Sequence, residues 1–214
     1  MGLVTSEFEK YSNNNYLSME SFIDTSASGT LAPVVDLFHR SYALPVIACL
    51  HAERGAKFVT LVNRLGASRD TVSFTLKHLI STGIVMKNPG YGHPMRPEYI
   101  LTGAGERLGG SCVALVAAID SMDIGSVAFK KWPMPVMAAI GRGADRFSNL
   151  LGHLQGVTPR ALTGALRDLD RIDVVERMVI DTWPPYPHYA LADAGELLMP
   201  ALDDLCLAAS SWGP

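Results

Sequence analysis

Four polar residues between positions 69 and 77 have the types and the spacing to contact DNA bases. Arg69, Ser73 and Lys77 follow one another at intervals of four, which places them on one face of a helix. An α-helix fits the major groove of B-form DNA, where Arg and Lys bind guanine edges and Ser binds several bases. Asp70 could accept a hydrogen bond from a cytosine amino group. The alternative is a solvated helix face, because many unrelated proteins have helices of this polarity.

A second set of candidate DNA-binding residues lies about ninety positions further along the chain. Arg160, Thr163 and Arg167 also share one face of an expected helix. The acids Asp168 and Asp170 stand beside them, so we expect this second helix to hold DNA less firmly than the first. It could instead serve partly as an interface.

Each expected helix is followed by a loop rich in Gly and Pro. The first loop, NPGYGHPMRP, and its flank carry Lys87, Asn88, His93 and Arg96. Such a loop can follow the DNA backbone and place Arg in the minor groove, although it could equally be a plain hairpin with charged residues. The second loop, DTWPPYP, has no basic residue. Its Trp183 and Tyr186 could cover the protein's own core, or touch a sugar or another subunit.

Motifs for catalysis and for cofactor binding are absent from the sequence. It has no GxxxxGK phosphate loop, no GxSxG elbow and no His/Glu pair at metal spacing, so we expect no catalytic residue, cofactor or metal. Glu106 and Glu196 are expected to cap or salt-bridge a helix. Cys49, Cys112 and Cys206 lie far apart and are expected to be buried small residues, with redox sensing and metal binding as alternatives.

The charge is unevenly distributed along the 214 residues, although the net charge is only −3. From Arg54 to Arg96 there are seven Lys or Arg and one acid, a balance of +6. From Asp181 onward there are five acids and no Lys or Arg. This pattern argues against indiscriminate coating of nucleic acid and favours one basic DNA-binding region. No apolar run is long enough to span a membrane and the N-terminus lacks a secretion signal, so we expect a cytoplasmic protein.

The chain contains an internal repeat with an offset of ninety residues. YILTGAGERL at 99–108 corresponds to YALADAGELL at 189–198, and the register extends back to Pro45 and Pro135. Only a slip of one residue near Phe58 and Phe147 interrupts it. Two copies of this length indicate a duplicated domain.

Periodicity and capping residues predict the same order of elements in both copies. We expect helices at 45–52, 57–65 and 69–82 and strands at 84–87 and 98–101, then helices at 134–140, 146–154 and 159–171 and strands at 174–180 and 188–191. Ser68 and Thr158 are the expected N-caps of the third helix in each copy. Further helices are expected at 31–39, at 108–122, and at 199–209, where they could pack together.

Helix, helix, turn, helix and hairpin is the order of a winged helix-turn-helix. The second copy resembles the HxlR family of bacterial regulators in Trp132, the Arg-Phe-Ser at 146–148, the segment 157–169, the Val-Glu-Arg at 175–177 and the PYPHYAL before Ala-Gly-Glu at 194–196. The first copy lacks the Trp and looks more like the related MarR group. The resemblance implies a DNA-binding regulator that dimerises, and the duplication puts that usual assembly in doubt.

These observations predict a mainly α fold with small β-wings, built from two tandem winged helix-turn-helix domains joined by a central helix. We expect a loosely ordered segment at 1–29, a first domain at 30–107, a linking helix at 108–126 and a second domain at 127–214. The expected function is sequence-specific binding of double-stranded operator DNA by two recognition helices, as a repressor. A small-molecule effector and a homodimer are open, as are the alternatives of a protein-interaction module and a replication-initiator type of DNA binder.

Overall fold

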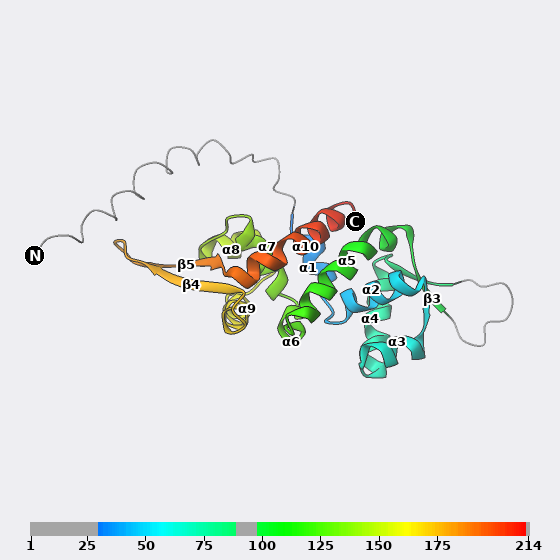
Figure 1. Ribbon diagram of the computed structural model, residues 1–214. Coiled ribbons are helices and arrows are strands. Elements are labelled where there is room, and N and C mark those ends of the chain that lie inside the picture. Colours follow the sequence, from blue (N-terminus) through cyan, green and yellow to red (C-terminus); the bar gives the residue numbers. More distant parts are fainter. Residues whose placement is uncertain (1–29, 89–97, 213–214) are drawn as a thin grey trace, which may run out of the picture.

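The computed structural model describes residues 30–88 and 98–212 of the chain (Figure 1). Its first half contains α1 (Ala32–Leu37), α2 (Ala43–Glu53), β1 (Ala56–Lys57), α3 (Phe58–Leu65), α4 (Arg69–Ser81), β2 (Val85–Lys87), β3 (Glu98–Leu101) and α5 (Gly103–Ser121). Its second half contains α6 (Gly125–Ala128), α7 (Pro133–Gly141), α8 (Phe147–His153), α9 (Pro159–Arg171), β4 (Val175–Ile180), β5 (Tyr186–Leu191) and α10 (Asp193–Ser210). The fold is mainly helical with small antiparallel sheets, as the sequence predicts.

Helix α4 begins and ends where local chemistry requires it. The Ser68 side chain accepts a hydrogen bond from the Thr71 amide at 3.2 Å, which satisfies one of the open donors of the first turn. Val72 and Leu76 are buried on the inner side of the helix. Gly83, at a φ of 72°, takes the left-handed conformation that turns the chain into β2.

Helix α9 repeats this construction ninety residues later. The Thr158 side chain accepts from the Ala161 amide at 3.2 Å, and Pro159 occupies the first turn, where its missing N–H costs nothing. Leu162, Leu166 and Leu169 bury the inner side. The bounds 159–171 agree with the prediction residue for residue.

The two hairpins are paired in equivalent registers. In the three-stranded sheet, with order β1-β3-β2, Val85 pairs with Leu101, and in the two-stranded sheet Val175 pairs with Leu191. The β4-β5 hairpin projects away from the helices in Figure 1. The short strand β1 and the helix α6 have no counterpart in the sequence-based expectation.

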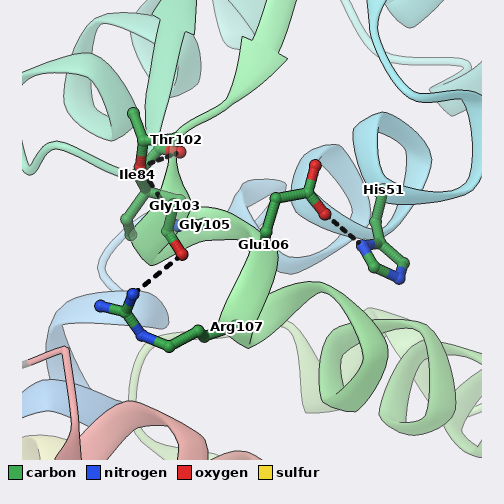
Figure 2. A network of polar contacts seen from close by, with 7 residues as sticks. All are labelled: His51, Ile84, Thr102, Gly103, Gly105, Glu106 and Arg107. Atoms are coloured by element: carbon green, nitrogen blue, oxygen red, sulfur yellow. Dashed lines mark hydrogen bonds and ion pairs between the residues drawn. The ribbon is translucent and has the colours of Figure 1, made fainter.

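A close approach of two backbones after each hairpin explains one repeated glycine. A Cβ on Gly105 would collide with the Ile84 carbonyl oxygen, and a Cβ on Gly195 would collide with the Val174 carbonyl oxygen. Figure 2 shows the first of these joints, where the Thr102 hydroxyl donates to the Ile84 carbonyl at 3.2 Å. The spacing of the two glycines therefore follows from a packing constraint that occurs twice.

Helix α5 differs in its bounds from the linking helix predicted at 108–126. It begins at Gly103, five residues earlier, because Thr102 acts as its N-cap and accepts from the Gly105 amide at 3.2 Å. It ends at Ser121, and α6 follows separately. The first strand-to-helix junction therefore leads directly into the long helix.

Helices α5 and α10 lie side by side at the centre of the molecule, α5 in green and α10 in orange to red (Figure 1). Ser111 on α5 donates to the Asp204 carbonyl on α10 at 3.3 Å. Helix α10 also packs on α1, as the sequence suggested for these three segments. The buried apolar residues of both halves form one continuous core.

Cys112 and Cys206 are buried, as predicted, whereas Cys49 is only partly buried. Within the two described ranges, no helix has the length and apolar character needed to cross a membrane. The loosely ordered segment expected at 1–29, and the loop residues His93 and Arg96, lie outside the described residues.

Candidate nucleic-acid interface

The outer face of α4 carries the first set of candidate residues. Arg69, Asp70 and Lys77 are exposed, and Ser73 is partly buried between them. Phe74 is 54 % exposed on the same face, and the Lys77 ammonium lies 5.5 Å from the centre of its ring. This cation–π contact holds Lys77 over an apolar side chain while leaving its charge open to solvent.

Arg69 is held by a similar contact at the beginning of α4. Its guanidinium lies 5.4 Å from the centre of the Phe58 ring at the start of α3. The contact crosses the turn between the two helices, so it fixes the Arg69 side chain relative to both. The resulting face presents two cations, one carboxylate and one exposed aromatic ring to solvent.

The outer face of α9 carries the second set, and all three residues are exposed. Arg160 and Arg167 flank Thr163, whose hydroxyl donates to the Pro159 carbonyl at 2.9 Å. That bond occupies the hydroxyl proton and leaves the Thr163 oxygen as an acceptor. The small Gly164 beside Thr163 adds no bulk to this face.

The acids beside α9 affect its charge less than the sequence suggests. Asp168 forms ion pairs with Lys130 at 2.7 Å and with Arg171 at 2.9 Å, and its side chain is 23 % exposed. Its charge is therefore compensated within the chain. Of the two acids expected to weaken the grip of α9, only Asp170 remains exposed without an ion pair in the described part of the chain.

The two hairpins that form the wings, β2-β3 and β4-β5, carry different side chains. Lys87 is exposed at the end of β2, which suits a backbone contact. Trp183 at the tip of the second hairpin is 98 % exposed, so the expectation that it could cover the protein's own core is wrong for this residue. The turn places its ring beyond the last strand residues, out of reach of any core side chain. Tyr186 is instead covered by Arg146, whose guanidinium lies 3.8 Å from the ring centre.

Two further exposed arginines, Arg177 and Arg146, were not among the expected DNA-binding residues. Arg177, exposed on β4, lines a cavity of about 240 Å³ together with Thr163, Arg167, Asp170 and Tyr189. Arg146 precedes α8 and is also exposed. The alternation of β4 could have revealed Arg177, because residues 175 and 177 of the strand share one face. The position of Arg146 depends on the packing of the hairpin.

Ionisable groups elsewhere on the described residues do not form a metal-binding cluster. No group of three His, Cys, Asp or Glu side chains within residues 30–88 and 98–212 is placed to hold a metal ion. Glu106 lies 3.0 Å from the His51 Nδ1 and so tethers α5 to α2 (Figure 2). The sequence predicts that Glu106 caps or salt-bridges a helix, and this hydrogen-bonded contact is an ion pair when the imidazole is protonated.

Comparison with known proteins gives a family match for the second half and relatives that cover part of the chain. Residues 127–214 match the family described as HxlR-like helix-turn-helix. A regulator of Methanothermobacter thermautotrophicus, described as an uncharacterised HTH-type transcriptional regulator, is 34 % identical over 83 residues, which are 39 % of this chain and 60 % of the relative. The HTH-type regulators YvaP and YtcD of Bacillus subtilis are 31 % and 32 % identical over 83 residues each, or 39 % of this chain. The matched stretch spans 77 % of YvaP and 63 % of YtcD.

One solved structure is also similar, a transcriptional regulator assigned to the MarR family from Enterococcus faecalis V583. It shares 29 % sequence identity and covers 44 % of this chain and 80 % of its own, with a TM-score of 0.36. That score is too low for the likeness to support a conclusion on the fold. The family match at residues 127–214 and the similarity to YvaP together establish the family. This chain belongs to the HxlR-like helix-turn-helix family.

Proposed function

We propose that this protein is a sequence-specific, double-stranded-DNA-binding transcriptional regulator that acts as a repressor. The observation that carries the proposal is the exposed basic face of α9, which lies within the stretch that matches the HxlR-like family. Arg160, Thr163 and Arg167 on this face have the donors and the acceptor needed to read base edges in a major groove. Binding to chromosomal DNA would place the protein in the cytoplasm.

The proposal extends to a second recognition helix, α4, in the same chain. Helices α4 and α9 have the same length, equivalent N-caps and equivalent hairpins at an offset of ninety residues. We therefore propose two tandem winged-helix domains, at 30–107 and 127–214, with the linking segment 108–126 between them. Lys87, and Arg96 beyond the described residues, would contact the backbone or minor groove beside α4.

The first experiment measures binding to duplex DNA taken from upstream of the protein's own gene. In a mobility-shift assay, the affinity should exceed that for a scrambled duplex and should fall steeply with salt, because each phosphate contact releases counterions. Equal affinity for both duplexes would contradict the proposal that the protein is a sequence-specific transcriptional regulator.

A matched pair of substitutions locates the interface. Arg167→Ala should weaken specific binding by roughly 5- to 150-fold, the equivalent of about 1–3 kcal/mol for a base contact. Arg171→Ala, on the same helix but paired with Asp168, should change it by less than about threefold. A reversed order of these two effects would exclude α9 as the recognition helix. The repressor role is tested separately with a reporter whose promoter contains the bound site, where the protein should lower transcription.

The wing of the second half supports a different candidate, a protein-interaction module. Trp183 and Val179 are 98 % and 59 % exposed, and the loop between the strands has an acid but no base. An apolar, acidic tip suits a protein surface better than a phosphate backbone. Loss of a partner protein on Trp183→Ala, with no DNA binding by the unchanged protein, would favour this candidate. A preference for replication-origin DNA over promoter DNA would favour an initiator.

A further inference from the structure

A cavity of about 650 Å³ lies between α2, α3, α5 and α6, away from the outer faces of both proposed recognition helices. Its size is within the range of roughly 300–1,000 Å³ that is typical of small-molecule sites. Helix α6 forms one wall and lies on the connection between the two halves of the chain. The cavity therefore sits at a joint of the molecule.

The walls are mostly apolar and include two aromatic rings. Tyr42 and Pro45 at the start of α2, Leu65 at the end of α3, Val116 on α5 and Phe129 after α6 all line the cavity. Each of these side chains is only partly buried, so each presents apolar surface to the space. Such a lining gains free energy by covering a flat apolar ligand, at about 25 cal/mol per Å² of apolar surface removed from water.

The charged groups around the cavity leave one carboxylate unpaired. Arg64 is held by Glu53 at 2.7 Å, and Lys130 is held by Asp168 at 2.7 Å. Both cations that line the cavity are thus already paired, and Lys130 shares the Asp168 carboxylate with Arg171. Asp120 also lines it, and within the described part of the chain its carboxylate has no hydrogen-bond or ion-pair partner.

The C-terminal ends of α3 and α5 favour a cation, whereas α6, a single turn of four residues, lines the cavity with its first residues, Gly125 and Ser126. Arg64 and Leu65 belong to the last turn of α3, and Asp120 is next to the last residue of α5. The carbonyl groups at the C-terminal end of a helix carry partial negative charge and stabilise a nearby cation. Helix α2 lines the cavity from end to end, so its dipole favours neither sign.

The cysteine in the wall is not suited to covalent capture of a ligand. Burial raises the pKa of the Cys49 thiol above its usual value, and the nearby Glu53 carboxylate raises it further, against a smaller opposing effect of Arg64. The thiol therefore stays protonated near neutral pH, and the thiolate is the nucleophilic form. A ligand in this cavity would be held by non-covalent contacts.

We propose that this cavity binds an aromatic cation, with its apolar body against Tyr42 and Phe129 and its ammonium group paired with Asp120. The rings add cation–π attraction for any part of the charge that lies over their faces. Neutral molecules of the same shape gain the apolar contacts without the ion pair. Anions of that shape meet the uncompensated carboxylate and bind least.

Three probes with the same biphenyl body distinguish these cases. They are 4-phenylbenzylamine, 4-phenylbenzyl alcohol and 4-phenylbenzoate, which are cationic, neutral and anionic at neutral pH. Isothermal titration calorimetry with the full chain should give the amine a dissociation constant about 5- to 10-fold below that of the alcohol, as expected for a charge-assisted hydrogen bond. The benzoate should bind more weakly than the alcohol.

Two variants and a control assign the binding to this cavity. Asp120→Asn should remove the preference for the amine and leave the alcohol unchanged, and Ala52→Trp, at an exposed wall position of α2, should abolish binding of both. Ala114→Trp, exposed on α5 and outside the wall, should bind the amine as the unchanged protein does. Thermal unfolding confirms that each variant is folded. Absence of amine binding, equal binding of all three probes, or a preference that survives Asp120→Asn would overturn the proposal.

Discussion

Single residues in this protein are constrained most tightly where two backbones meet. At Gly105 there is no room for a side chain, because the Ile84 carbonyl and the Leu101 side chain occupy the position of a Cβ. Gly110, five residues further along α5, has open space around it. The same residue type therefore has opposite roles within one helix.

This contrast gives a stability prediction. Gly105→Ala should lower the free energy of unfolding by about 1–3 kcal/mol, because a backbone carbonyl cannot move aside as a flexible side chain can. Gly110→Ala should raise it by about 0.5–1 kcal/mol, because Ala loses less conformational freedom than Gly on forming a helix. Urea unfolding of both variants measures the difference. Equal effects of the two substitutions would show that the close approach at Gly105 is relaxed in solution.

The stacked histidines at the end of α1 and on α4 form a second residue-level feature. The ring centres of His39 and His78 lie 5.1 Å apart. Partial burial lowers the pKa of His39 below its ordinary value of 6.5, and the charges of Lys131, His78 and Arg40 lower it further against the opposing effect of Asp36. The folded chain therefore favours neutral His39.

The sign of the pH dependence follows from this lowered pKa. Above pH 6.5 His39 is neutral in both states and its contribution is fully present, whereas below 6.5 the unfolded chain takes up a proton that the folded chain resists. The free energy of unfolding should therefore fall as the pH drops from about 7 toward 5.5. In urea titrations, His39→Gln should reduce this fall. A steeper fall for His39→Gln would contradict the assigned direction.

At the scale of elements, α4 and α9 are alike in construction and unlike in surface. The caps, the buried Leu and Val positions and the following hairpins correspond, but α4 exposes Phe74 where α9 has the small Gly164. The surroundings also differ in charge, since the stretch from Arg54 to Arg96 has a balance of +6. The two helices thus correspond on their inner faces and differ on their outer faces.

The difference in charge predicts a ranking of the two helices in DNA binding. Arg69→Ala or Lys77→Ala should weaken operator binding more than Arg160→Ala or Arg167→Ala, because the first helix sits in the more basic surroundings. Because Asp168 is paired with Lys130 and Arg171, it repels DNA less, and the expected difference in binding loss between the α4 and α9 variants is smaller. Mobility shifts of the four variants, with folding checked by circular dichroism, give the order. Larger losses for the α9 variants would show that local charge does not decide the ranking.

At the scale of the molecule, the two halves are joined by more than one connection. Helix α10 packs on both α5 and α1, and the indole N–H of Trp212 donates to the Thr82 carbonyl at the end of α4 at 3.3 Å. Trp212 thus contacts the C-terminal end of α4, the first proposed recognition helix. Such an interlocked core favours a fixed relation between the halves.

This arrangement predicts that one chain binds an imperfect inverted repeat. The two proposed recognition helices, held by one core, would resemble the two helices of a dimer, whose half-sites lie about 34 Å apart on one face of the duplex. Because α4 and α9 present different side chains, the half-sites should differ in sequence. Footprinting together with the mass of the complex should show two unequal, adjacent protected half-sites for each chain. A perfectly symmetric footprint, sensitive only to substitutions on α4, would indicate instead a homodimer that reads DNA with its first half.

The sequence by itself determined the features that depend on neighbouring residues. The bounds of α9, the N-caps Ser68 and Thr158 and the strand β3 follow from capping, periodicity and turn chemistry within a few residues. The ninety-residue repeat added the equivalence of the two hairpins. The family resemblance of the second half could also be recognised from the sequence, because it rests on contiguous motifs.

Only the tertiary structure decided which distant groups meet. The pairing of Asp168 with Lys130 joins residues thirty-eight positions apart, and β1 exists only because Ala56 and Lys57 pair with β3. The exposure of Trp183 and the cavity beside Asp120 depend likewise on how helices and hairpins pack. Local preferences fix a segment's conformation, but solvent exposure and ion pairing depend on the packing of segments that are far apart in the chain.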